Sequence, residues 1–149
     1  MRAVVQRVRD CTVRVENVSV GSIGSGLLVY LGIESKDDER DIRYLADKIL
    51  NLRIFTDEQG KMNHSVIDKD AELLVVSQFT LHADVRKGRR PSYDGAAPTD
   101  QAEPMYEAFL KELEALWKRP ERGRFGAHME VSYTNSGPVT ILLDSKKLF

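Results

Sequence analysis

The chain has 149 residues, a formal net charge of −1 and 42% hydrophobic residues. This length suits one domain that buries about 70% of the surface its unfolded chain exposes, so we expect a single domain over residues 1–149. No apolar run approaches the roughly 20 residues that span a bilayer, and the first ten residues lack the apolar segment of a secretory signal. The single cysteine, Cys11, excludes an intrachain disulfide and suits a reducing compartment. We therefore expect a cytoplasmic protein with no membrane partner.

The N-terminal third has the pattern of β-strands. Segments 2–8, 12–23 and 26–33 are rich in Val, Ile or Leu, and polar and apolar residues alternate around a turn at Glu16 and Asn17. This pattern predicts a meander. The glycines from Gly21 to Gly26 do not open a helix, as those of a dinucleotide-binding loop do, and we interpret them as a hairpin turn.

Two stretches have helical periodicity. In the first, which we expect Ser35 to cap and which ends near Leu50, apolar residues recur at Ile42, Leu45, Ala46 and Ile49. The second begins between Thr99 and Pro104, and a broad apolar stripe follows from residue 105 to 117. Both stripes are typical of helices that pack against a core.

The remaining apolar segments predict further strands. Residues 51–61 contain a short strand closed by a turn, and residues 71–81 give the strongest pattern of a buried strand. Two final strands are expected at 128–135 and 138–145, around Gly137 and Pro138. With strands at both ends and two main helices between them, we expect an α+β fold whose mostly antiparallel sheets form a barrel-like core.

The segment 75–84 contains Ser77, His82 and Asp84 and suggests a serine hydrolase. In a continuous strand Ser77 and His82 would face opposite sides, and Ser77 is not on a G-x-S-x-G elbow, so such an enzyme would need His64 or His128 from elsewhere. The three histidines have no metal-ligand spacing, and we expect no metal and no cofactor. Backbone amides at the end of this strand can hold an oxyanion if the ladder stops there.

A cluster of four cations follows this segment: Arg86, Lys87, Arg89 and Arg90. Because the net charge is close to zero, any binding to nucleic acid has to come from such a local cluster. The alternative is ordinary solvated surface. From composition alone, both interpretations stay open.

Four motifs then resemble those of the D-aminoacyl-tRNA deacylase family. They are SQFTL at 77–81, RKGRRPS at 86–92, FGAHM at 125–129 and NSGPVT at 135–140. Segments 1–8, 26–33 and 51–66 resemble the family as well, so the likeness runs in order along nearly the whole chain. The resemblance implies an enzyme that hydrolyses the ester between a D-amino acid and the terminal adenosine of tRNA, and that also removes glycine from alanine tRNA.

The resemblance also implies a homodimer with an active site at each subunit interface. Its catalytic floor would be Ser77, Gln78, Phe79 and Thr80, with the backbone N–H groups of Phe79 and Thr80 as oxyanion donors and Gln78 and the Thr80 hydroxyl orienting the substrate. The partner subunit would contribute Gly137 and Pro138, whose cis peptide bond turns carbonyl oxygens into the pocket and excludes an L side chain.

Two further roles follow from the resemblance. Arg7 would hold the Gly-Pro segment in its orientation, and Arg86, Lys87, Arg89 and Arg90 would contact phosphates of the acceptor stem without reading its sequence.

The chain departs from the family pattern at two positions. His82 stands where the family commonly has tyrosine, and Ser136 stands where aspartate is usual. A related editing enzyme with altered chirality or tRNA preference is therefore one alternative. The others are a non-catalytic RNA-binding module that uses the basic cluster, and a conventional serine esterase that uses Ser77.

Overall fold

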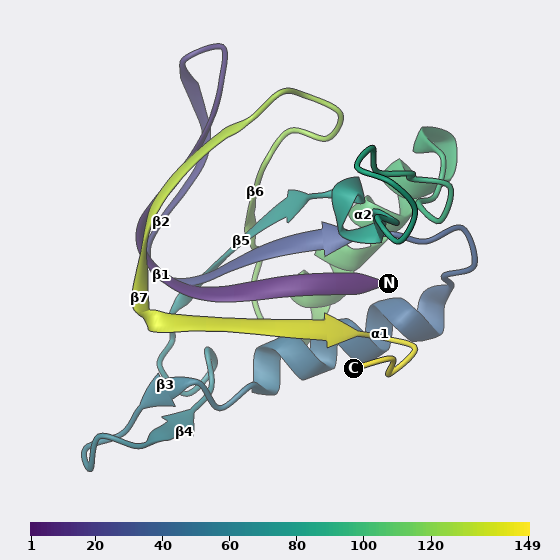
Figure 1. The fold of residues 1–149 in the computed structure, drawn as a ribbon. Helices are drawn as coiled ribbons and strands as arrows, with labels where there is room; N and C mark the ends of the chain where they lie inside the picture. The colour runs from purple at the N-terminus through teal and green to yellow at the C-terminus, as the bar shows by residue number, and fades with distance from the viewer.

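The computed structural model describes residues 1–149 and contains one five-stranded sheet, a separate two-stranded hairpin, two α-helices and a 3-10 helix (Figure 1). In chain order the elements are β1 (Arg2–Val15), β2 (Val18–Gly32), α1 (Glu39–Asn51), β3 (Phe55–Thr56), β4 (Met62–His64), β5 (Glu72–Ser77), η1 (Phe79–His82), α2 (Thr99–Leu116), β6 (Glu121–Arg122) and β7 (Glu130–Asp144). Neither α-helix has the length and apolar character that crossing a membrane requires.

The sheet has the strand order β6-β5-β2-β1-β7. β1 pairs antiparallel with β2 and with β7, whereas β5 pairs parallel with β2 and with β6. The α+β class with two helices is confirmed. The prediction of a barrel-like core is wrong, because the edge strands β6 and β7 do not pair to close the sheet. The sheet is mixed: the two longest pairings, β1 with β2 and β1 with β7, are antiparallel as expected, whereas the crossover through α1 returns β5 parallel to β2.

The first two strands form one long hairpin with its turn at Glu16 and Asn17, as the alternation predicts. The hairpin turn expected at the glycines is wrong, because Gly21 and Gly26 lie inside β2. A Cβ on Gly26 would stand 2.0 Å from the carbonyl oxygen of Glu72, and one on Gly21 would stand 2.4 Å from that of Arg122. These glycines therefore permit neighbouring backbones to approach β2 closely.

The N-cap of helix α1 is Asp38, three residues later than the cap expected at Ser35. The carboxylate of Asp38 accepts a hydrogen bond from the Arg40 amide at 2.8 Å, and the carboxylate of Asp41 accepts one from the Asp38 amide at 2.8 Å. This reciprocal capping box satisfies two amides that the helix leaves free. Helix α2 begins at Thr99, within the expected interval, and carries Pro104 in its interior.

The main core lies between one face of the sheet and the two helices. Its completely buried side chains include Val5, Leu27, Leu45, Phe109 and Leu113, drawn from β1, β2, α1 and α2. A smaller cluster on the other sheet face contains Val8, Cys11, Ile23, Leu28 and Leu74. The two clusters cover β2 and β5 on both faces of the sheet. The end of β5 is therefore held in place by packing on both of its faces.

The two strands expected near the C-terminus are one strand, β7, which bends sharply between its halves (Figure 1). Its register with β1 passes from Thr140 opposite Gln6 to Asn135 opposite Val8, so residues 136–139 have no partner in this ladder. We call residues 136–139 the β7 bend. Gly137 and Pro138 are exposed there.

Candidate active site

The expected catalytic floor lies where β5 ends. The apolar residues 73–76 are buried in the sheet, the pairing with β2 ends at Ser77 opposite Leu31, and the Gln78 amide donates to the Leu31 carbonyl at 2.8 Å. The chain then turns, because the carbonyl of Gln78 accepts the amide of Leu81 at 3.3 Å. Alternation of faces therefore does not continue past Ser77, and the continuous strand predicted for residues 71–81 is wrong beyond that residue.

Phe79 and Thr80 occupy the first turn of η1. The first N–H groups of a helix have no acceptor within the helix, and the ladder to β2 has already ended. Two adjacent amides are thus presented at a strand end, which is a suitable geometry for binding an oxyanion. Gln78 Nε2 also donates a hydrogen bond to Thr80 Oγ1, so these two side chains orient one another.

A cavity of about 680 Å³ opens beside this floor, a size that suits a small-molecule or nucleoside ligand. Ser77, Gln78 and Phe79 line it, whereas Thr80 does not. Its remaining walls come from β2, the loop before α2, the start of α2 and the segment before β7. They include Leu31, Ile33, Tyr93, Ala96, Ala97, Thr99, Ala102, Phe125, Gly126, Ala127, His128 and Met129.

The predictions from sequence assigned no role to two groups of residues that line the cavity. Tyr93 packs edge-to-face against Phe79 with ring centroids 5.1 Å apart, and residues 125–129 line another part of the cavity. The second group coincides with the FGAHM motif, in which the small Gly126 and Ala127 lie between larger side chains, and this pattern was the signal that could have pointed to it. Nothing in its spacing placed it beside Ser77, because that contact depends on the path from α2 to β7.

One distant histidine lines the same cavity as the serine. His128 and Ser77 line the same cavity, but they are not hydrogen bonded, and the chain forms no ion pair at His128. His64 lies 3.9 Å from Glu58 on the β3–β4 hairpin, away from the cavity. A serine, a histidine and a carboxylate are therefore not assembled in this chain.

Gly137 and Pro138 do not line the cavity of their own chain. Their peptide bond is cis, in agreement with the expectation for the bond itself. Arg7 contacts the β7 bend, since its Nε donates to the Ser136 carbonyl at 3.1 Å, and its Nη1 donates to the Ile54 carbonyl at 2.6 Å. Arg7 thus joins the β7 bend to the chain just before β3, while the roles of all three residues stay predictions.

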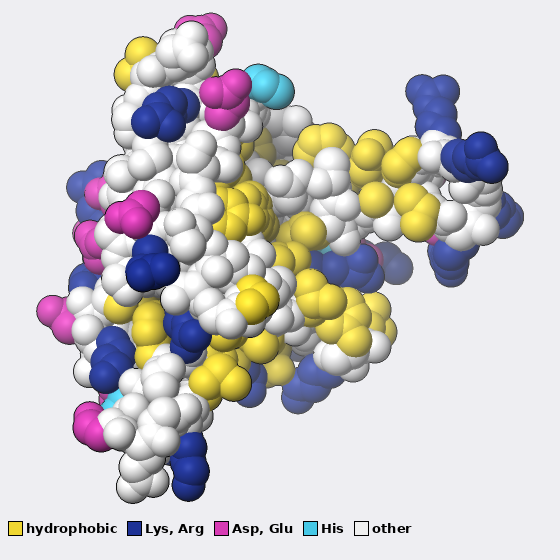
Figure 2. All heavy atoms as spheres, turned by 60° about the vertical axis from the view of Figure 1, so that its left-hand side comes forward, with side chains coloured by type: hydrophobic (Ala, Val, Ile, Leu, Met, Phe, Trp, Pro, Cys, Tyr) yellow, Lys and Arg dark blue, Asp and Glu magenta, His cyan; other side chains and the backbone are white.

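The basic cluster lies in the loop between η1 and α2. Figure 2 shows Lys and Arg side chains gathered on a projecting arm of the molecule, and Arg86, Lys87, Arg89 and Arg90 are all exposed. Arg86 pairs with Asp84 at 2.6 Å and holds the pKa of that carboxyl well below its usual range. The other three cations make no ion pair within the chain, so most of the positive charge of the arm is available to a partner.

Comparison with known proteins identifies the family. The family model described as D-Tyr-tRNA(Tyr) deacylase matches residues 4–144. The chain belongs to this family.

Relatives in the deacylase family match over the full length. The chain is 58% identical to a D-aminoacyl-tRNA deacylase of Thermosipho africanus and 55% identical to one of Thermotoga petrophila, and both alignments cover 100% of each chain. Among solved structures it is similar to one titled c-Myc DNA Unwinding Element Binding Protein. The TM-score is 0.92 and the identity 46%, with 97% of this chain and 98% of the other covered. The likeness to this family thus covers the whole chain.

His82 is buried at the end of η1 and is only 7% exposed. Its Nε2 has no hydrogen-bond partner. Burial lowers the pKa of His82 from 6.5, and the nearby charge of Arg2 lowers it further. Both effects favour the neutral imidazole, and the ring lies at the end of η1 against Gly32 of β2.

We predict that His82 makes the protein less stable in acid. Because its folded pKa lies below the unfolded value of 6.5, the unfolded chain binds more protons, and stability falls as the pH drops below about 6.5. The slope from this one group approaches about 1.4 kcal/mol per pH unit. Urea unfolding at pH 5.0–8.0 should show a flatter profile for His82→Phe than for the wild type. Identical slopes would contradict this account.

Proposed function

We propose that this chain hydrolyses the ester bond between a D-amino acid and the terminal adenosine of tRNA, in the cytoplasm where tRNA is charged. One observation supports this most directly: a cavity of about 680 Å³ is lined by Ser77, Gln78 and Phe79 and so adjoins the first turn of η1, in a chain of the deacylase family. The mainly apolar walls accept an adenosine and an amino-acid side chain, and the floor supplies donors for the oxyanion.

In the proposed reaction the oxygen of a water molecule forms a bond to the carbonyl carbon of the ester. The π electrons of the C=O bond move to the carbonyl oxygen. The amides of Phe79 and Thr80 stabilise this oxyanion, and one such donor contributes about 10²–10³ in rate. When the intermediate collapses, the bond between the acyl carbon and the ribose oxygen breaks, and that oxygen takes the proton that the attacking water gives up. The adjacent ribose hydroxyl assists the water, while Gln78 and the Thr80 hydroxyl hold the substrate. Ser77 supports the floor and forms no covalent bond.

Selection for D substrates is proposed to come from the partner subunit of a homodimer. Gly137 and Pro138 are exposed at the β7 bend, outside the cavity of their own chain, and are free to enter that of a second copy. Their backbone carbonyls would contact the α-carbon region and clash with an L side chain, so that handedness is tested without reading side-chain identity. Glycine lacks a side chain that clashes, so glycine on alanine tRNA is a further proposed substrate.

An exposed apolar strip supports the dimer. Leu142 on β7 is 59% exposed, and its partner in the ladder, Val4, is half-buried on the same sheet face. Large apolar side chains beside one another on a sheet face gain free energy when a second surface covers them. A second copy that covers this strip would also bring its own β7 bend with it, because Leu142 and Pro138 belong to one strand.

The projecting arm that carries Arg86, Lys87, Arg89 and Arg90, here called the exposed arm, is the proposed contact for the acceptor stem. Lys87, Arg89 and Arg90 are free of ion pairs, and their loop connects η1, at the floor, to α2. Phosphate contacts of this kind position a substrate and carry no base sequence, which suits an enzyme that accepts many tRNAs.

The first test compares D-tyrosyl-tRNA with L-tyrosyl-tRNA. We expect rapid release of D-tyrosine and a rate for the L ester close to that of buffer alone, measured by the loss of acid-precipitable radioactive amino acid. Equal hydrolysis of both esters would indicate the alternative, a related enzyme with altered chirality. Binding of tRNA without hydrolysis of either ester would instead favour the RNA-binding module.

A second test separates main-chain catalysis from a serine esterase that uses Ser77 and His128. We expect Ser77→Ala and His128→Ala each to retain most of the D-tyrosyl-tRNA activity, within about tenfold of the wild type, because neither side chain is the nucleophile or its base. Loss of a true nucleophile reduces kcat by several orders of magnitude. Such a loss in both variants would establish the esterase mechanism and refute ours.

A third test asks whether each site is built from two subunits. Phe79→Pro removes one amide donor at the first position of η1, where proline is tolerated, and Gly137→Val places a side chain at a φ of +131°. Each variant alone should be inactive. After coexpression, random pairing should restore about a quarter of the wild-type activity, since half of the dimers hold one intact site. No recovery in mixed dimers, verified by two affinity tags, would show that the site is not shared.

A further inference from the structure

A second hollow, of about 780 Å³, lies beside the β7 bend. We call it the basic hollow. Its charged lining residues are Arg7 and Arg9 of β1, Lys69, Asp70 and Glu72 around the start of β5, and Lys118 after α2. Ser25, Thr56 and Ser136 add hydroxyl groups. The lining is therefore rich in hydrogen-bond donors and is chemically unlike the mainly apolar cavity at the floor.

The basic hollow has an excess of positive charge. Four cations face two carboxylates, a difference of +2. Arg7 donates to the carbonyls of Ser136 and Ile54 and has no carboxylate partner, and the exposed Arg9 and Lys69 make no ion pair. Only Lys118 is paired, with Asp70 at 3.0 Å. The chain itself therefore leaves three of the four cations without a counter-charge, and an anionic partner would supply it.

The position of the basic hollow indicates which anion it meets. Arg7 Nε contacts the Ser136 carbonyl at 3.1 Å, and a Cβ on Gly137 would stand 2.9 Å from Arg7 Nη2. The basic hollow thus directly adjoins the segment proposed to enter the partner's cavity. If the terminal ester of an RNA strand lies in that cavity, the backbone phosphates of its last few nucleotides come close to the basic hollow.

We propose that the basic hollow binds backbone phosphates of the tRNA acceptor end whose ester occupies the partner's cavity. This inference rests on the proposed function and on its shared site. One tRNA is then held by two subunits: the exposed arm of the chain that supplies the floor, and the basic hollow of the chain that supplies the β7 bend. Both contacts are made to phosphates, so the added affinity is independent of base sequence.

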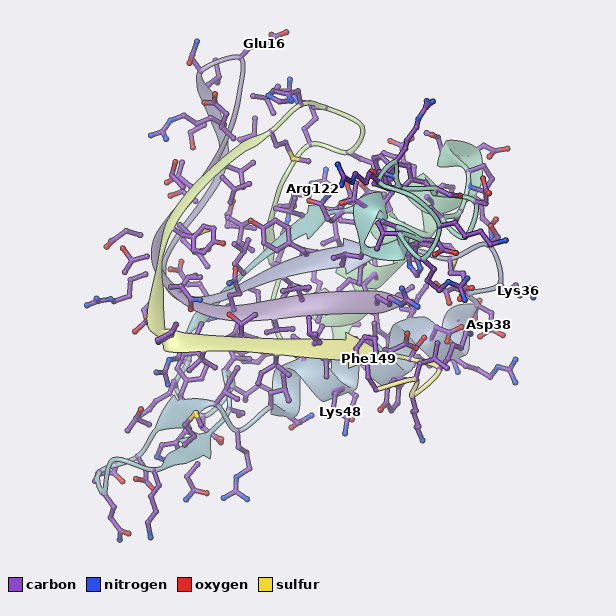
Figure 3. The ribbon with its side chains drawn as sticks, in the orientation of Figure 1. Glu16, Lys36, Asp38, Lys48, Arg122 and Phe149 are labelled. Carbon is purple, nitrogen blue, oxygen red and sulfur yellow. The ribbon has the colours of Figure 1, made fainter.

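The test neutralises two cations of the basic hollow that the proposed mechanism does not use, in the double variant Arg9→Gln with Lys69→Gln. The matched control is Arg14→Gln with Lys36→Gln, two exposed cations without ion pairs. Figure 3 shows Lys36 on the opposite side of the molecule from the corner at which β7 bends. Each protein is assayed on D-tyrosyl-tRNA and on the D-tyrosyl ester of adenosine, which carries no phosphate.

We expect the double variant to lose about tenfold in kcat/KM for the tRNA, mainly through KM, while cleavage of the adenosine ester and activity of the control variant stay unchanged. The slope of log(kcat/KM) against log[salt] should become shallower by about 2, one for each lost phosphate contact. An unchanged slope, an equal loss in the control variant, or an equal loss on the adenosine ester would each overturn the assignment. Failure of the wild type to cleave either ester would instead refute the proposed function.

Discussion

The candidate site depends on where the parallel pairing of β5 with β2 stops. The ladder runs from Gly26 opposite Glu72 to Leu31 opposite Ser77, and one last hydrogen bond joins the Gln78 amide to the Leu31 carbonyl. If the strand continued, the amides of Phe79 and Thr80 would take part in a ladder and would not be available to a substrate. The tight approach of β5 at Gly26 fixes the start of this pairing, and the buried residues 73–76 fix its direction.

The sequence predicts the parts of this fold that local patterns determine. The turn at Glu16 and Asn17, the apolar face of α1 and the buried run before Ser77 all follow from periodicity and turn chemistry. The open mixed sheet does not, because the parallel direction of β5 arises from a long crossover that no local pattern encodes. The glycines of β2 mislead for a similar reason: their role is the close approach of Glu72 and Arg122, which are distant in sequence.

The site itself could be predicted only through the resemblance. Side-chain chemistry pointed to Ser77, His82 and Asp84, but His82 is buried at the end of η1 and Asp84 is paired with Arg86. The groups that matter in the proposed mechanism are main-chain amides, and every residue except proline has one, so composition and spacing carry no signal for them. No local pattern shows that His128 and Ser77 line one cavity, since this depends on the path of the segment between α2 and β7.

The β7 bend also affects how this open sheet meets other molecules. β7 is a 15-residue edge strand, and a straight edge of that length would offer a long row of unpaired backbone groups to any other extended chain. Residues 136–139 interrupt that row, and Pro138 has no N–H to donate. The same few residues that we assign to substrate selection thus divide the exposed edge into two short parts. This protects the sheet from indiscriminate strand addition and favours association through its face.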